Sequence, residues 1–146
     1  MTEEKIAGIM RDVIKALETG DVEKGLSFFA EDGVWVTPDG RYKGKEELRR
    51  YLTNSAQSMQ DMKVTEAGNK IIVQGNKAFY EHVIAATIEG RRAEGLAMCA
   101  WEFSDDKIQE VRTVYDRLLM AKQAANGWLA KTLVNSIVKK AEKGLH

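Results

Sequence analysis

The sequence contains only one cysteine, one proline and two histidines in 146 residues. The lone Cys99 excludes an internal disulfide or a multi-cysteine metal site, and it is typical of a protein in a reducing compartment. No apolar run approaches the roughly 20 residues needed to span a bilayer. Glu3 and Glu4 near the start do not fit the charge pattern of a secretory signal. We therefore expect a cytoplasmic protein.

Signatures of metal, phosphate and nucleic acid binding are also missing. His, Asp and Glu do not cluster at the spacing of metal ligands, and no glycine-rich turn precedes a Lys-Ser or Lys-Thr pair. We therefore predict no metal and no cofactor. The net charge is zero, but residues 117–146 carry six basic residues and one acidic residue, which leaves residues 1–116 at −5. An acidic body without a basic, aromatic-studded sheet face argues against a nucleic acid partner.

The composition, with 44% hydrophobic and 30% charged residues, is typical of one globular domain. Apolar residues at steps of three and four predict a helix over residues 3–17, which Thr2 and Gly20 would cap. Asp21 would cap a second, short helix that includes Phe28 and Phe29. A third helix is expected over residues 45–58.

Short β-rich runs make up most of the remaining body. The run 34–37 ends at a turn over residues 38–40, and five later runs are separated by turn signals such as Gly75-Asn76. These runs cover residues 62–66, 70–74, 78–88, 92–103 and 108–115. Successive hairpins predict a curved antiparallel meander packed on the early helices.

The tail from residue 117 to 144 has a helical pattern, with apolar residues at steps of four and a break at Asn126-Gly127. Its apolar face is too wide for a free surface helix. We predict that a cone domain over residues 1–120 is followed by an amphipathic extension over residues 121–146. This extension would pack on the domain or on its dimer partner, while a membrane surface is the less favoured alternative.

Two parts of the chain resemble a known family. The segments 20–35 and 40–48, with Gly20-Asp21, Asp32-Gly33-Val34-Trp35 and Gly44-Lys45, are similar to the N-terminal pattern of SnoaL-like and ketosteroid isomerase-like proteins. The segments 105–108 and 114–116 resemble the last hairpin and strand of those proteins. The resemblance places residues 3–120 in the nuclear transport factor 2-like superfamily. It implies an α+β fold, in which a cone-shaped, curved antiparallel sheet encloses a pocket and packs on three N-terminal helices.

The resemblance also allows single functional residues of the family to be aligned with this sequence. The tyrosine, the catalytic base and the oxyanion aspartic acid of ketosteroid isomerases align with Val13, Thr37 and Cys99. None of these three side chains can supply that chemistry, so the standard steroid isomerisation is not expected. Asp116 is similar to the acid/base aspartate of SnoaL-type cyclases.

Strand alternation predicts which residues face the pocket. His82, Tyr80 and Tyr115 would face it together with a largely apolar lining, which is typical of a small-molecule site. The predicted lining consists of Val13, Leu17, Phe29, Thr37, Tyr51, Leu52, Ile84, Ala97, Cys99, Trp101, Val111 and Thr113.

Four residues are candidates for catalysis. His82 could act as a general base near neutral pH, or it could be a core histidine bonded to Tyr80 or Tyr115. Asp116 could be the acid/base or the N-cap of the following helix. Tyr80 or Tyr115 would donate a hydrogen bond. Cys99 has no activating cation beside it and is expected to be inert.

These observations predict a small cofactor-independent pocket protein that binds or converts a hydrophobic small molecule. The conversion would be an isomerisation, cyclisation or dehydration by proton transfer. The alternatives are a non-catalytic carrier, and a protein or membrane interaction module that uses the basic C-terminal helix. The sequence leaves open whether the protein is an enzyme. The outer sheet face is expected to form a homodimer through Phe79, Val83, Ala85, Leu96, Met98 and Ala100.

Overall fold

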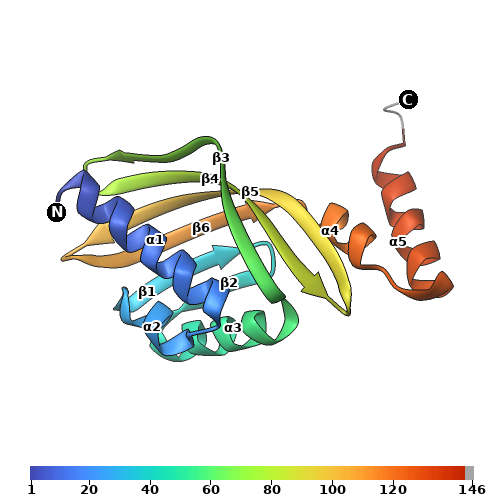
Figure 1. The fold of residues 1–146 in the computed structure, drawn as a ribbon, viewed down its shortest axis with the longest axis horizontal. Helices are drawn as coiled ribbons and strands as arrows, with labels where there is room; N and C mark the ends of the chain where they lie inside the picture. Colours follow the sequence, from blue (N-terminus) through green and yellow to red (C-terminus); the bar gives the residue numbers. More distant parts are fainter. Residues whose placement is uncertain (144–146) are drawn as a thin grey trace.

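The computed structural model describes residues 1–143, which form five helices and six strands (Figure 1). Two helices precede β1, a third lies between β2 and β3, and two more follow β6. The helices are α1 (Glu3–Thr19), α2 (Val22–Ser27), α3 (Gly44–Ser58), α4 (Arg117–Ala124) and α5 (Gly127–Ala141). The strands are β1 (Phe29–Thr37), β2 (Gly40–Lys43), β3 (Gln60–Gln74), β4 (Lys77–Ile88), β5 (Arg91–Ser104) and β6 (Lys107–Tyr115).

The strands form one sheet in the order β2-β1-β6-β5-β4-β3. The pairs β3–β4, β4–β5, β5–β6 and β1–β2 are antiparallel, as the meander predicts, but β1 and β6 run parallel. The sheet is therefore mixed. This difference arises because β1 pairs with a strand from the far end of the chain, and local turn signals do not encode the direction of such a pairing.

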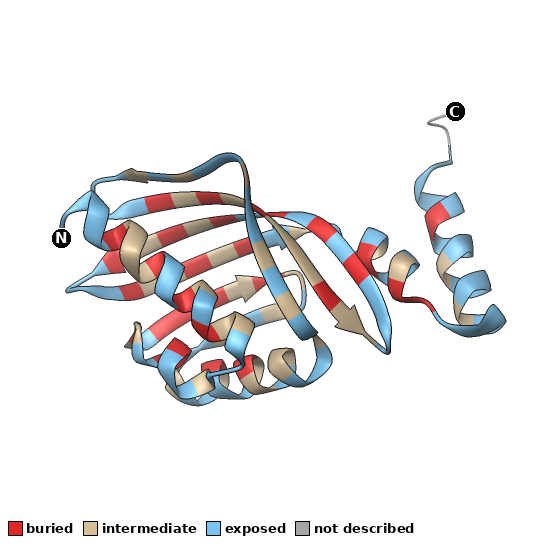
Figure 2. Ribbon diagram, in the orientation of Figure 1, coloured by how far each residue is buried: buried red, intermediate tan, exposed pale blue. Residues whose placement is uncertain are grey.

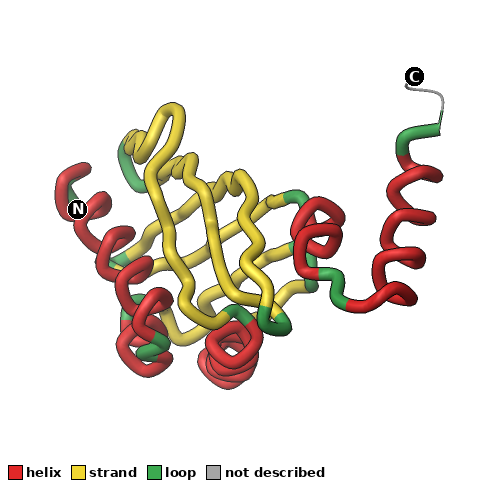
Figure 3. Tube along the Cα trace, turned by 45° about the vertical axis from the view of Figure 1, so that its right-hand side comes forward, coloured by secondary structure: helices red, strands yellow, loops and turns green. Residues whose placement is uncertain are grey.

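The sheet is strongly curved, and α1, α2 and α3 lie on one side of it (Figures 1 and 3). Helix α1 packs mainly on β3 and helix α3 mainly on β1, so the two helices lie toward opposite edges of the sheet on the same face. The predicted α+β cone with three N-terminal helices is confirmed.

Local signals fix the helix ends. The Thr2 hydroxyl accepts a hydrogen bond from the Lys5 amide at 3.2 Å, and Gly20 ends α1 with φ +68°. The Asp21 carboxylate accepts from the Lys24 amide at 3.0 Å and begins α2. These are the predicted caps.

Two boundaries differ from the prediction. Phe29, which was expected in the second helix, begins β1 instead and is buried. The two short strands expected around residues 67–69 are one strand, β3, with a register shift between Glu66 and Ile71. Gly68 and Lys70 have φ of +46° and +57°, so the expected turn is a bulge inside the strand.

The main core lies between α1 and the concave face of the sheet. Ile6, Met10 and Val13 of α1 are buried together with Phe103 of β5 and Ile108 of β6. Buried and exposed residues alternate along β5 (Figure 2), as expected for a strand with one face on a core. The closed end of the cone is therefore filled with side chains.

The C-terminal helices behave differently from each other. Helix α4 packs on β5, where Met120 and Ala124 are buried against Ala93. Helix α5 makes its main contacts with α4 and stands away from the cone (Figure 1). In the single chain, Val138 of α5 is buried, while Leu129, Leu133 and Ile137 of the stripe at steps of four are exposed. Packing of this stripe on the domain stays a prediction. Packing on a dimer partner stays a prediction, and residues 144–146 of the predicted extension lie outside the described residues.

Candidate functional site

A cavity lies inside the cone, between the sheet and helices α1, α3 and α4. Its free volume is about 70 Å³. That space would hold roughly five water molecules, or a molecule of about one ring. The lining residues are Ile14, Leu17, Trp35, Tyr51, Leu52, Ser55, Met59, Met62, Val64, His82, Ile84, Gly95, Cys99, Trp101, Thr113, Tyr115 and Met120.

The described lining is mostly apolar, and none of its members is an Asp, Glu, Lys or Arg. Its polar groups are the hydroxyls of Ser55 and Thr113, two phenols, the Cys99 thiol, two indoles and one imidazole. Chemistry in this cavity therefore depends on neutral side chains. Of these, only the imidazole has an ordinary pKa near neutrality.

His82 lies in the middle of β4 and is 2% exposed. The Tyr80 ring stacks on it at 4.3 Å between centroids and 19° between planes. Its Nδ1 is buried and has no hydrogen-bond partner. Burial lowers the pKa of His82 below its ordinary 6.5 and outweighs the Tyr80 backbone, which acts in the opposite direction, so the imidazole is mostly neutral at pH 7. A neutral imidazole with an unbonded nitrogen can accept or donate a proton.

A short polar chain crosses the cavity wall. Trp35 Nε1 donates to Thr113 Oγ1 at 2.9 Å, and the Cys99 sulfur lies 3.2 Å from the same oxygen. Burial raises the pKa of Cys99 to about 11, so the thiol is protonated and a weak nucleophile. Trp101 Nε1 is buried without a partner, which leaves one donor free at the cavity.

Tyr115 is bonded to a cluster near the start of α4. Its hydroxyl donates to Asp39 Oδ2 at 3.1 Å, and Asp39 Oδ1 also pairs with Arg117 at 2.9 Å. Burial, followed by the Asp39 charge, holds the pKa of Tyr115 well above its ordinary range. Burial also raises the pKa of Tyr51 to about 12. Both phenols are therefore hydrogen-bond donors at neutral pH rather than bases.

The structure brings nine of the predicted site residues together around this cavity. They are His82, Tyr115, Leu17, Tyr51, Leu52, Ile84, Cys99, Trp101 and Thr113.

Seven other predicted residues lie outside the lining. Val13, Phe29 and Val111 are buried in the core, Ala97 is buried on β5, and Tyr80 packs against the His82 ring. Alternation identifies the inward face of a strand, but the narrow end of the cone is filled by α1 and α2, so facing inward does not place a residue at the cavity. Thr37 instead accepts from the Asp39 amide at 3.0 Å.

Asp116 also lies away from the cavity. It is exposed, and its carboxylate accepts from the Leu119 amide at 2.9 Å. It is therefore the N-cap of α4, which was the alternative considered for it. Its carboxylate is not part of the cavity lining.

Some lining residues were not predicted. Trp35 shares a strand face with Thr37, so alternation along β1 could have identified it. Met62 shares a face of β3 with Val64, so alternation could have identified it too, whereas Met59 and Met120 carry no such signal. Met120 reaches the cavity because Gly95 lacks a side chain, since a Cβ there would lie 3.2 Å from the Met120 sulfur.

Within residues 1–143, no three His, Cys, Asp or Glu side chains gather where they could hold a metal ion. None of the helices in this part of the chain has the length and apolar character of a membrane span.

Comparison with solved structures finds several that share the fold. A Catenulispora acidiphila protein with a ketosteroid isomerase-like fold, solved with trimethylamine, is 17% identical with a TM-score of 0.74, over 82% of this chain and 93% of that one. An LEH-like epoxide hydrolase of M. tuberculosis is 18% identical with a TM-score of 0.70, over 92% and 97%. A nuclear transport factor 2-like protein of Burkholderia xenovorans is 21% identical with a TM-score of 0.68, over 85% and 98%.

The sequence itself gives the family. No curated protein matches it. The model of the SnoaL-like domain matches residues 10–111, which span the cone from α1 into β6. The chain therefore belongs to the SnoaL-like domain family, within the nuclear transport factor 2-like superfamily.

Proposed function

We propose that this protein binds a small, largely apolar molecule in the cone cavity and that His82 transfers a proton on it without a cofactor. The observation that carries the proposal is a buried, neutral imidazole in an apolar cavity, with Nδ1 lacking a partner. Neutral imidazole is the usual general base near pH 7. Isomerisation, cyclisation and dehydration all need such a step.

The size and polarity of the cavity narrow the ligand. Space for about one ring and a mostly apolar lining favour a compact hydrophobic molecule. The free indole N–H of Trp101 favours a ligand that carries an oxygen acceptor, because a bound acceptor would remove the cost of a buried unpaired donor. A cyclic ketone or an ether of that size fits both requirements. The solved relatives include an epoxide hydrolase and a protein bound to trimethylamine, which agrees with small ligands in this fold.

The other catalytic candidates have lesser roles in this proposal. Asp116 caps α4, and the Tyr115 hydroxyl is already donating to Asp39. Tyr80 supports the His82 ring by stacking. His82 is therefore the only one of the four that we propose as the base.

The test uses cyclohexanone, whose α-protons exchange with D₂O when a base removes them. Wild-type protein is expected to accelerate this exchange, measured by NMR, and His82→Gln is expected to reduce it to the solvent rate. Asp116→Asn is the matched control, since asparagine keeps the cap and removes the carboxylate. Loss of exchange in Asp116→Asn with full exchange in His82→Gln would show that the base is wrongly assigned.

A non-catalytic carrier is the second candidate, and the nearly all-apolar lining favours it. A carrier would bind cyclohexanone and leave its α-protons unexchanged. Shifts of indole and methyl NMR signals on titration would report binding separately from exchange. Binding in wild type without acceleration would therefore support the carrier and exclude the proton transfer.

We also propose that the protein is a cytoplasmic homodimer that associates through its outer sheet face. Leu96, Met98 and Val114 are exposed there, and burial of apolar surface favours association. Sedimentation at micromolar concentration should give twice the mass of 16.4 kDa. A monomer at that concentration would contradict this part of the proposal.

A further inference from the structure

Helix α5 carries an apolar face that nothing covers in the single chain. Trp128, Leu129, Leu133 and Ile137 are between 49% and 74% exposed. The last three recur at steps of four and therefore lie on one side of the helix. Val138, on another side, is buried and lines a groove shared with residues of α4. Helix α5 therefore buries only part of its apolar surface within the chain. The part that stays exposed needs another partner to cover it.

The attachment of α5 limits how that face can be covered. Helix α4 is fixed to β5, because Gln123 Oε1 accepts from the Glu94 amide at 2.9 Å and Gln123 Nε2 donates to the Glu94 carbonyl at 2.7 Å. The Arg91 side chain adds a bond of 3.2 Å to the Gln123 carbonyl. Only Ala125 and Asn126 separate the two helices, and Ala125 is buried. Two residues span about 7 Å, so the start of α5 stays beside α4.

A second apolar surface lies on the outer face of the sheet. Leu96 and Met98 of β5 and Val114 of β6 are between 36% and 62% exposed. Met98 and Val114 are register partners, and Leu96 follows on the same face of β5, so the three form one patch, the outer patch. It lies close to the end of β6, from which the chain enters α4.

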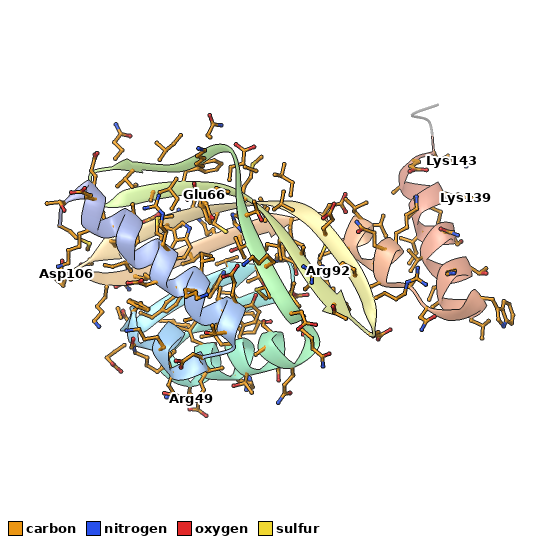
Figure 4. All side chains as sticks on the ribbon, viewed as in Figure 1. Arg49, Glu66, Arg92, Asp106, Lys139 and Lys143 are labelled. Atoms are coloured by element: carbon orange, nitrogen blue, oxygen red, sulfur yellow. The ribbon has the colours of Figure 1, made fainter. Side chains whose placement is uncertain are left out.

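Charge favours a pairing between these two surfaces. The C-terminal segment carries a charge of +5, and the preceding 116 residues carry −5. Lys131, Lys139 and Lys140 are exposed on α5, and Figure 4 shows Lys139 on this helix and Lys143 just beyond its end, clear of the cone. Glu81 and Glu94 flank the outer patch.

We propose that α5 of each copy docks on the outer patch of a second copy, so that the homodimer is held by exchanged C-terminal helices. The inference rests on the proposed self-association and names the element that fills the outer face. The α5 face and the outer patch each carry three exposed apolar side chains, so the exchange of two helices would remove four such surfaces from water.

The test is cross-linking of co-expressed single-cysteine variants with a short bismaleimide, in the full-length chain. Leu133→Cys marks the α5 face and Met98→Cys marks the outer patch, while the native Cys99 is buried and stays in every sample. The pair is expected to give on the order of tenfold more linked dimer than either variant alone. Asn135→Cys, exposed on the opposite side of α5, is the matched control and should link with Met98→Cys only weakly.

The other outcomes overturn the inference in distinguishable ways. Linking of Leu133→Cys alone would mean that two α5 helices meet, and linking of Met98→Cys alone would mean that two sheets meet directly. A dimer by sedimentation without linking in the pair would refute helix exchange and leave the dimer standing, whereas a monomer would refute both. Co-sedimentation with phosphatidylcholine and phosphatidylserine vesicles, without linking, would assign the α5 face to lipid.

Discussion

Protonation of His82 should make the folded protein less stable below neutral pH. Burial lowers the folded-state pKa of His82 below the ordinary 6.5. The unfolded chain therefore takes up the proton first as pH falls. The contribution that the neutral His82 makes to the free energy of unfolding is complete above an unfolded-state pKa of about 6.5. It is lost as pH falls from there toward the folded-state pKa.

The size of the effect follows from one proton. The slope is at most about 1.4 kcal/mol per pH unit, so wild type should lose up to about 1.4 kcal/mol between neutrality and about pH 5.5 through this group alone. Because His82 is 2% exposed, solvent screening does not reduce the effect as it would at the surface. His82→Gln removes the titration, so its free energy of unfolding should fall less over the same interval.

Urea unfolding of both proteins at matched concentration, from about pH 7.5 to pH 5.5, measures the difference. His146→Gln reports what the only other histidine contributes. Parallel pH profiles for wild type and His82→Gln would refute the reasoning. An NMR titration that places the folded-state pKa of His82 at or above 6.5 would contradict the premise that burial lowers this pKa.

Two further predictions concern positions outside the cavity. Asp116→Ala should lower the free energy of unfolding by about 1 kcal/mol because the Leu119 amide loses its cap, while Asp116→Asn should change it little, as urea unfolding would show. Gly68→Ala should destabilise more than Gly75→Ala: both glycines have positive φ, but only at Gly68 would the new Cβ displace the Glu81 carboxylate, which accepts two hydrogen bonds from Asn69. Equal melting temperatures for the two glycine variants would contradict the close contact at Gly68.

The elements that the sequence predicted well are those fixed by short-range chemistry. Thr2 and Asp21 bond to amides three residues away, so their effect is readable from spacing alone. Gly75 has the positive φ that its hairpin turn requires. Phe29 shows the limit, because an aromatic pair fits a helix as well as a strand. Its place in β1 depends on the pairing with Ile108, far along the chain.

The sequence predicted which strand residues point inward, but not which of them line the cavity. Alternation placed His82, Cys99 and Thr113 on the inward face, and all three line the cavity. The same rule selected Val111, which lies in the filled end of the cone. Whether an inward residue meets space or another side chain depends on how α1 and α4 pack above it. That packing is a property of the whole fold and not of one strand.

For helix α5, too, the sequence predicts a local property but not the packing that depends on the whole fold. Its apolar spacing correctly indicates a surface that water disfavours, because that property belongs to the helix alone. The spacing contains no information on which surface covers it, and the single chain leaves Leu129, Leu133 and Ile137 exposed. The same chain also leaves the outer patch exposed and divides its charge between an acidic body and a basic tail. A sequence that keeps two apolar surfaces exposed, one on an acidic body and one on a basic helix, favours contact between copies of the chain.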